Sequence, residues 1–214
     1  MNENVSTSIS GRLIIAWLFV FSLVLIWSAI NPHDWFTWFL EVLPAIMGLI
    51  ILAATYKRFT FTKLAYWLIL LHAIILMIGG HYTYAEVPLF NWLRDTFDLG
   101  RNHYDKVGHF AQGFVPAIIA RELLIRKSPV KHGRWLSFMG ICICLALSAT
   151  YELFEWWVAE ATGTASEAFL GTQGYAWDTQ SDMFFALLGS ISALLFLSGT
   201  HDRELPHTEN AIVP

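Results

Sequence analysis

The feature that most constrains this chain is a series of apolar runs, each long enough to cross a lipid bilayer as a helix. A bilayer core is about 30 Å thick and needs roughly 20 apolar helical residues to cross it. Hydrophobic residues make up 56% of the 214 residues and charged residues only 14%, against about 25% in an average soluble domain. The mean hydropathy is +0.50. This composition predicts an all-α membrane bundle and excludes a disordered chain, a disulfide scaffold and a basic nucleic-acid-binding protein.

Six runs are candidates for membrane-spanning helices. The fourth is the least hydrophobic, because His109, Gln112, Arg121 and Glu122 interrupt it. Polar side chains at membrane depth almost always face other helices, so we expect this helix inside the bundle. The prediction is a single integral membrane domain over 1–214, with spans at 13–30, 35–55, 64–80, 108–125, 135–158 and 182–200 and a polar tail at 201–214.

The distribution of basic residues predicts the orientation of these spans. Cytoplasmic loops carry an excess of Lys and Arg. If the N-terminus is cytoplasmic, nine basic residues fall on the cytoplasmic side and three on the other, with Arg121 left out because it lies within a span. The nine are Arg12, Lys57, Arg58, Lys63, Arg126, Lys127, Lys131, Arg134 and Arg203, and the three are Arg94, Arg101 and Lys106. The sequence therefore predicts that both termini are cytoplasmic.

The predicted topology brings scattered ionisable residues to one depth at the outer side of the membrane. The fourth span begins there, the fifth ends there, and the sixth begins there. Residues three or four apart on a helix share a face. The pairs are Asp105 and His109 on the fourth helix, Glu152 and Glu155 on the fifth, and Asp178 and Asp182 on the sixth.

Five carboxylates and one imidazole gathered in one place would repel one another unless some are protonated or a cation lies among them. Lys106, His109 or a bound cation could supply the compensation. Oxygen-rich ligands with one imidazole suit Mg²⁺, Ca²⁺ or Mn²⁺, and also Zn²⁺ or Fe²⁺. The same groups could instead form a general acid and base pair. A divalent metal is therefore a candidate cofactor, and the sequence does not identify one.

A structural explanation competes with a functional one for these residues. Asp105, Asp178 or Asp182 could cap the start of a helix and complement its dipole. Glu152 and Glu155 cannot be explained in this way, because they lie near the C-terminal end of their helix, where the dipole disfavours acids.

Other polar residues give weaker signals. Arg101 and His103, just before the fourth span, could bind an anionic headgroup or phosphate, or could belong to a solvated loop. We expect Glu41 and His72 to have unrelated packing roles and Arg121 to extend towards the inner headgroups.

The two predicted outer loops cover residues 81–107 and 159–181. Loops longer than about 12 to 15 residues are uncommon in compact domains, and both of these exceed that length. The first is rich in aromatic and charged residues. It predicts a short interfacial helix around Leu89 to Phe97.

Three segments give the chain a resemblance to the VanZ-like membrane protein superfamily, and within it to YjdF-like bacterial inner-membrane proteins. They are DKVGHF at 105–110, ELFE at 152–155, and DTQSD at 178–182 with a glycine at position 189. The resemblance implies a multi-pass inner-membrane protein linked to the cell envelope. Its family-matched positions are Asp105, Lys106, His109, Glu152 and Asp178.

The chain departs from the VanZ pattern at three positions. Glu155 replaces a glutamine, Asp182 replaces an asparagine, and Phe185 replaces a glycine. Two amides have become acids, so the site in this chain is more anionic.

The leading hypothesis is a site that acts on or binds a cell-envelope or lipid-linked substrate at the extracytoplasmic face. His109 or Glu152 would be the general base, and Asp105 would orient His109. A divalent metal would be held by acids on two helices. The predicted metal ligands are Asp178, Asp182 and Glu155, and the predicted substrate-binding residues are Lys106, Arg101 and His103.

Two other classes of function fit the same residues. A proton- or cation-coupled transporter would use the carboxylates as a relay and needs a second polar vestibule on the cytoplasmic side, for which the sequence offers Arg121 and Glu122. A structural or regulatory membrane protein would use the network only to hold three helices together. The lipid bilayer is the expected partner in every case, and the sequence sets no oligomeric state and does not decide whether the protein is an enzyme.

Overall fold

The computed structural model describes residues 10–163 and 167–206, and every regular element within these ranges is a helix. This confirms the predicted all-α class. The elements are α1 (Gly11–Ser28), α2 (Trp35–Thr55), α3 (Lys63–Tyr82), the 3-10 helix η1 (Tyr84–Glu86), α4 (Pro88–Phe97), α5 (Tyr104–Lys127), α6 (Arg134–Thr162), α7 (Glu167–Leu170) and α8 (Asp178–Glu204).

Short polar side chains begin the first three helices. Ser10, Asp34 and Thr62 each accept a hydrogen bond from the backbone N–H three residues further along the chain. Such a bond satisfies one of the free N–H groups at a helix start. The local sequence therefore sets where α1, α2 and α3 begin.

Five helices, α1, α2, α3, α6 and α8, are long and apolar enough to cross a membrane. Many of their large apolar side chains are exposed, including Ile15, Leu195 and Phe196, which are 70%, 73% and 76% exposed. Exposed apolar faces of this extent suit helices that contact lipid. The described part of the chain is thus a multi-pass helical bundle, while the sixth span over α5 and the orientation stay predictions from the sequence.

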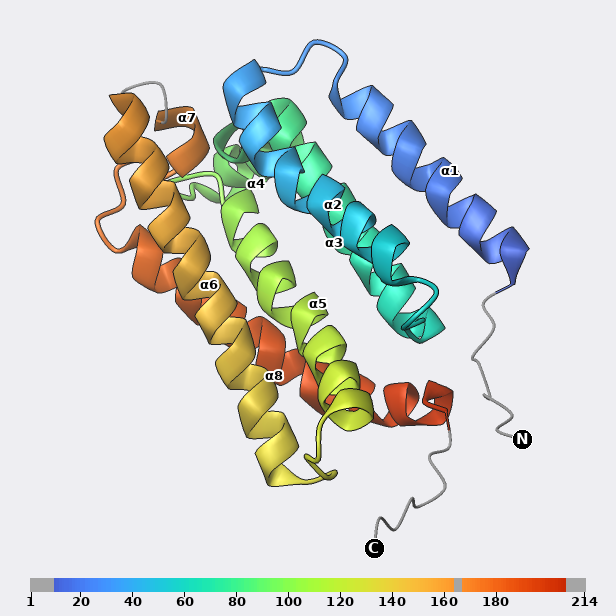
Figure 1. The fold of residues 1–214 in the computed structure, drawn as a ribbon. Helices are drawn as coiled ribbons and strands as arrows, with labels where there is room; N and C mark the ends of the chain where they lie inside the picture. The colour runs from blue at the N-terminus through green and yellow to red at the C-terminus, as the bar shows by residue number, and fades with distance from the viewer. Residues whose placement is uncertain (1–9, 164–166, 207–214) are drawn as a thin grey trace, which may run out of the picture.

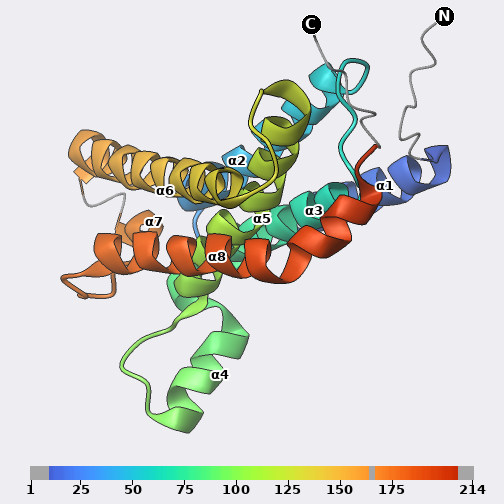
Figure 2. The same cartoon turned by 90° about the horizontal axis from the view of Figure 1, so that it is seen from below.

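Helix α5 is the central helix of the bundle. It packs against α3, α6 and α8, whereas α1 and α2 lie on the far side of α3. Figure 1 shows α1 at the edge of the bundle, and Figure 2 shows α8 lying across α5. Thirteen residues of α5 are buried, and they include charged ones. The expectation that the least hydrophobic of the six helices lies inside the bundle is therefore correct.

Helices α5 and α8 approach each other closely through two glycines. A Cβ atom added at Gly113 would overlap the carbonyl oxygen of Ala186, and one added at Gly189 would overlap the carbonyl oxygen of Phe110. Small residues at such crossings let two membrane helices come together at backbone distance. This contact holds the middle parts of α5 and α8 at backbone distance.

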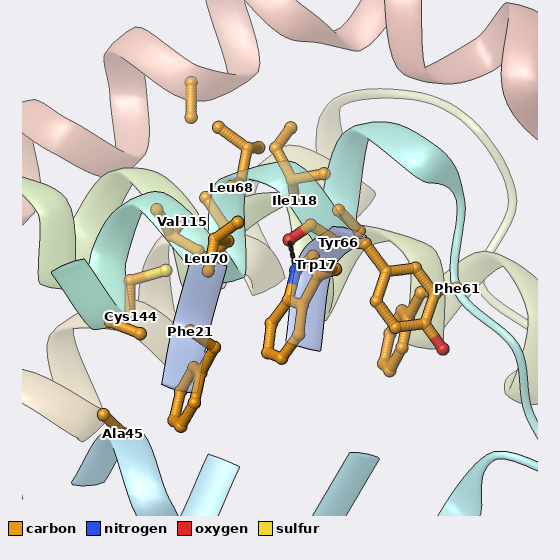
Figure 3. Close-up of a cluster of buried hydrophobic side chains, with 14 of the residues drawn as sticks. Trp17, Phe21, Ala45, Phe61, Tyr66, Leu68, Leu70, Val115, Ile118 and Cys144 are labelled. Carbon is orange, nitrogen blue, oxygen red and sulfur yellow. Dashed lines mark hydrogen bonds between the residues drawn. The ribbon is translucent and has the colours of Figure 1, made fainter. Parts of the chain in front are cut away.

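The apolar core joins α1, α2, α3, α5, α6 and α8, and Figure 3 labels core residues from the first five of these helices. Trp17 and Phe21 of α1 stack with ring centroids 5.3 Å apart. The indole N–H of Trp17 donates a 2.8 Å hydrogen bond to the backbone oxygen of Tyr66. A buried indole needs such a partner, and here the partner lies on α3, so the bond holds α1 against α3.

The predicted short helix before α5 is confirmed as α4, which projects from the rest of the bundle in Figure 2.

The two long loops are joined by two hydrogen bonds between Asn102 and Gln173. The backbone N–H of Asn102 donates to Gln173 Oε1 at 3.0 Å, and Gln173 Nε2 donates to the backbone oxygen of Asn102 at 2.9 Å. Asn102 also donates to the backbone oxygen of Val87. These bonds place the segment before α5 against the segment before α8.

The close contact of α5 and α8 makes a testable prediction. Gly189→Ala should destabilise the protein by about 1–3 kcal/mol, because the added methyl group must push the two backbones apart. The control is Gly199→Ala in the same helix, where an added Cβ meets nothing within 4 Å. Thermal unfolding of the purified protein in detergent measures both, and equal melting temperatures for the two variants would contradict the proposed close contact.

Candidate functional site

A buried cluster of charged side chains lies where α5 and α8 begin. Arg101, just before α5, donates from Nη1 to Asp178 Oδ1 at 2.7 Å and to the backbone oxygen of Thr172 at 3.0 Å. Its Nη2 donates to Asp105 Oδ2 at 3.2 Å. The arginine thereby bridges the first turns of both helices.

Lys106 lies at the centre of the same cluster. Its ammonium donates to Asp182 Oδ1 at 2.5 Å, to Asp105 Oδ2 at 3.1 Å and to Asp178 Oδ1 at 3.2 Å. An ammonium has three N–H donors, and these three bonds use all of them. We call the group of Arg101, Asp105, Lys106, Asp178 and Asp182 the ionic cluster; each member is less than 10% exposed.

His109 extends the ionic cluster one turn further along α5. Its Nε2 lies 3.2 Å from Asp105 Oδ1 and 3.8 Å from Asp182 Oδ2. Its Nδ1 lies 3.0 Å from Gln112 Oε1. An oxygen acceptor at each nitrogen favours the doubly protonated imidazolium form of the ring.

Glu152 of α6 approaches the histidine from the other side. Its Oε1 lies 3.8 Å from His109 Nδ1 and is buried without a hydrogen-bond partner among the described residues. Buried polar atoms are nearly always paired, so each exception calls for an explanation. This carboxylate oxygen is positioned to take a proton or to contact a ligand.

The geometry favours a different set of metal donors from the predicted one. One donor atom each from Asp105, His109 and Asp182 lies within 4.8 Å of the others, and these residues are buried. The predicted set was Asp178, Asp182 and Glu155. Asp178 instead bonds to Arg101 and Lys106.

Most predicted site residues come together. His109 contacts the ionic cluster, and Glu152 approaches His109. The ionic cluster itself consists of Arg101, Asp105, Lys106, Asp178 and Asp182. Glu155, less than one turn beyond Glu152, interacts electrostatically with Glu152 and His109. His103 lies at the outer edge and lines a pocket beside the ionic cluster.

Glu41 is a member of this region that sequence reasoning set aside. This α2 residue is 4% exposed. It bonds to Tyr84 and interacts electrostatically with Asp105 and His109. We expected Glu41 to have a packing role unrelated to the site, and the structure instead places it among groups that interact with Asp105 and His109. The signal was present in the sequence, since a lone acid in an apolar helix needs polar neighbours.

The pocket beside the ionic cluster has a volume of about 530 Å³. It is lined by Arg101, His103, Lys106, Tyr175, Ser181 and Phe185. Partial burial, and then the nearby charges of Arg101 and Lys106, lower the pKa of His103 below its usual 6.5.

A second polar cluster lies at the other end of α5. Glu122 is fully buried and accepts hydrogen bonds from the backbone N–H and hydroxyl of Thr62, from Arg126 at 2.6 Å and from His201 Nε2 at 3.1 Å. The bonds from Thr62 and His201 join α5 to the start of α3 and the end of α8, and the bond from Arg126 lies within α5. This arrangement satisfies both carboxylate oxygens, which is what a buried acid needs in a structural role.

Arg121 belongs to the second cluster, so the expectation that it extends to the headgroups is wrong. The side chain is buried, and it donates to His201 Nδ1 at 2.8 Å and to Asp202 Oδ1 at 2.7 Å. Because His201 accepts at Nδ1, its proton lies on Nε2, which faces Glu122. Partners on α8 are available because the end of that helix packs beside α5, a proximity that the sequence did not reveal.

The position of Lys106 predicts a large effect of removing its charge. Lys106→Met should destabilise the protein by about 3–5 kcal/mol, because it leaves three buried carboxylates with too little compensation. Lys131→Met, at an exposed lysine, is the matched control. Unfolding in detergent measures the loss. Adding Asp182→Asn to Lys106→Met should restore part of the stability, because it removes one of the uncompensated charges. A Lys106→Met protein as stable as the wild type would overturn this account of the ionic cluster.

Comparisons with known proteins agree with the fold. The family model described as "Predicted membrane protein (DUF2238)" matches residues 13–203. The chain is 51% identical over 184 residues to the inner membrane protein YjdF of Escherichia coli (strain K12). The aligned region covers 86% of this chain and 88% of YjdF. No solved structure matches the chain significantly. The predicted YjdF-like relationship and bacterial inner-membrane location are thereby confirmed, and the chain belongs to the DUF2238 family of predicted membrane proteins.

Proposed function

We propose that this protein binds or chemically changes a cell-envelope or lipid-linked substrate at an extracytoplasmic site made by α5, α6 and α8. The proposal includes six spans with both termini cytoplasmic, as the bias of basic residues favours. It also retains the resemblance to the VanZ-like superfamily and its link to the cell envelope. The residues that carry the proposal are those around His109.

The orphaned Oε1 of Glu152, 3.8 Å from His109 Nδ1, is the observation on which the proposal rests. Asp105 and Asp182, whose carboxylate oxygens lie 3.2 Å and 3.8 Å from His109 Nε2, both bond to Lys106. An acid and a histidine held beside each other, with the histidine oriented by Asp105, form a general acid and base pair. In this proposal a bound substrate supplies the missing partner of Glu152.

Lys106 favours a version of the site in which an ammonium takes the place of a metal ion. A divalent ion among Asp105, His109 and Asp182 would lie next to this ammonium, which bonds to both aspartates. Two cations at such a distance repel strongly in a buried site. The chemistry in this version is acid–base chemistry by His109 and Glu152.

The second cluster bears on the rival proposal of a coupled transporter, which needs a polar vestibule on the cytoplasmic side. Glu122 and His201 supply polar groups there, but both are fully buried and bonded to each other and to their neighbours. Between the two clusters, α5 and α8 touch at backbone distance through Gly113 and Gly189. These observations favour a structural role for the second cluster.

The function is tested by the lipids of cells that carry the wild-type protein or a variant. We expect the wild type, returned to an Escherichia coli strain without YjdF, to change the abundance of at least one lipid-linked species. His109→Gln should reduce that change at least tenfold, because the ring no longer accepts and donates protons. Mass spectrometry of extracted lipids measures it.

His132→Gln is the control for this experiment, since that histidine is exposed. Identical lipid profiles for wild type and His109→Gln, with both proteins present in the membrane at equal levels, would reject the proposal. An unstable His109→Gln protein would instead support the purely structural role, and the melting temperature of the purified variant separates the two results.

The ammonium version makes a separate prediction about metals. Calorimetric titration of the purified wild type with Mg²⁺, Mn²⁺, Ca²⁺ and Zn²⁺ should show no stoichiometric binding. Lys106→Met should gain binding and melt at a higher temperature with the ion, because its acids then lack a cation. One ion bound per wild-type chain, and lost in Asp182→Asn but not in Asp95→Asn, would instead establish a metal site.

A further inference from the structure

The pocket beside the ionic cluster presents cations without presenting acids. Arg101 and Lys106 line it, whereas none of the aspartates that hold them does so among the described residues. The aspartates therefore fix the two cationic side chains from behind. A site of this kind attracts an anion and places it against charges that cannot move away.

Two N–H donors of Arg101 have no hydrogen-bond acceptor among the described residues, the one on Nε and the second on Nη2. An arginine has five N–H donors in a planar fork. The structure uses three of them, on Asp178, Thr172 and Asp105. Nε is buried and has no hydrogen-bond partner among the described residues, in a side chain that is 9% exposed and lines the pocket.

An oxyanion is the ligand that suits such a donor. Arginine binds phosphate with short, charge-assisted hydrogen bonds, and its flat fork matches the oxygen spacing of a phosphate group. The remaining lining offers the hydroxyls of Tyr175 and Ser181 and the imidazole of His103. The guanidinium carbon of Arg101 lies 5.4 Å from the centre of the Tyr175 ring, so the tyrosine packs over the cation and borders the opening.

We propose that this pocket binds the phosphate group of an anionic ligand, with Arg101 Nε as the donor that recognises it and Lys106 as a fixed positive charge. This inference rests on the proposed function, because it names the chemical class of the substrate that the His109 site would receive. The phosphate could belong to a lipid headgroup or to a free phosphate compound.

The surroundings of the pocket suit a phosphate that carries acyl chains. Phe185 lines the pocket on α8. Its neighbour Phe184 and the preceding Trp177 are 53% and 65% exposed. Tryptophan is enriched where headgroups meet hydrocarbon. A phospholipid held at Arg101 could therefore extend its chains along the exposed apolar side of α8.

The test measures binding to the full-length protein in detergent by isothermal titration calorimetry. The probes are dioctanoyl phosphatidic acid, dioctanoylglycerol, which lacks the phosphate, and inorganic phosphate. We expect phosphatidic acid to bind at least tenfold more tightly than dioctanoylglycerol. Equal affinity for these two probes, or no binding of phosphatidic acid, would overturn the inference.

Inorganic phosphate identifies the source of the ligand. Displacement of phosphatidic acid by inorganic phosphate at equal concentration would assign the pocket to a free phosphate compound. Failure to displace it would assign the pocket to a lipid headgroup. Either result requires phosphate recognition, so either supports the shared chemistry.

Variants place the binding in this pocket. Arg101→Lys keeps the positive charge but lacks Nε–H, and it should weaken phosphatidic acid binding at least tenfold. Arg94→Lys, at a more exposed arginine of the same loop, is the matched control and should bind as the wild type does. Wild-type affinity in Arg101→Lys would contradict the assigned donor.

A second variant guards against misfolding when Arg101 is changed. Ser181→Leu fills the pocket and leaves every bond of the ionic cluster in place, so it should also lose at least tenfold in affinity. His109→Gln should still bind phosphatidic acid. A wild-type protein that binds phosphatidic acid but leaves the lipid profile of cells unchanged would defeat the proposed function alone. A changed lipid profile without phosphatidic acid binding would defeat only this inference.

Discussion

The rest of this site depends on the electrostatic constraint that charges buried among membrane helices must be neutralised where they lie. A charged side chain at the bilayer centre costs at least about 2.5–3.5 kcal/mol, and more without partners. Lys106 meets this constraint with three aspartates from two helices. Its bonds determine which parts of α5 and α8 must lie together, and hence where His109 faces α6.

The packing of small residues makes this neutralisation possible. Asp105 and Asp182 reach the same ammonium because Gly113 and Gly189 let the two backbones touch further along the helices. Membrane helices gain little from burying apolar side chains against each other, so close packing and polar contacts decide how they associate. The glycine contact and the ionic cluster therefore support each other, although they lie at different depths.

Much of this arrangement could be predicted from the sequence. The apolar runs predicted the long helices, and the aromatic and charged segment before α5 predicted α4. Because successive spans run in opposite directions, the sequence also predicted that Asp105, His109, Glu152 and the later aspartates lie at one end of the bundle. The sequence offered Lys106, His109 or a bound cation as compensation for these acids but could not decide among them, because neither composition nor spacing tells which cation lies between acids. The position of Glu41 beside Asp105 and the bond between Glu122 and His201 also escaped prediction, since both depend on which faces of distant helices meet.

The second cluster has a consequence for how the protein can move. Arg121 and Glu122 bind the end of α8 while Lys106 binds its start, so α5 and α8 are fastened to each other at both ends. A helix pair fixed at two points cannot slide or rotate internally without breaking buried ionic bonds. Any movement of α6, the helix that carries Glu152, against this rigid pair would alter the distance between Glu152 and His109.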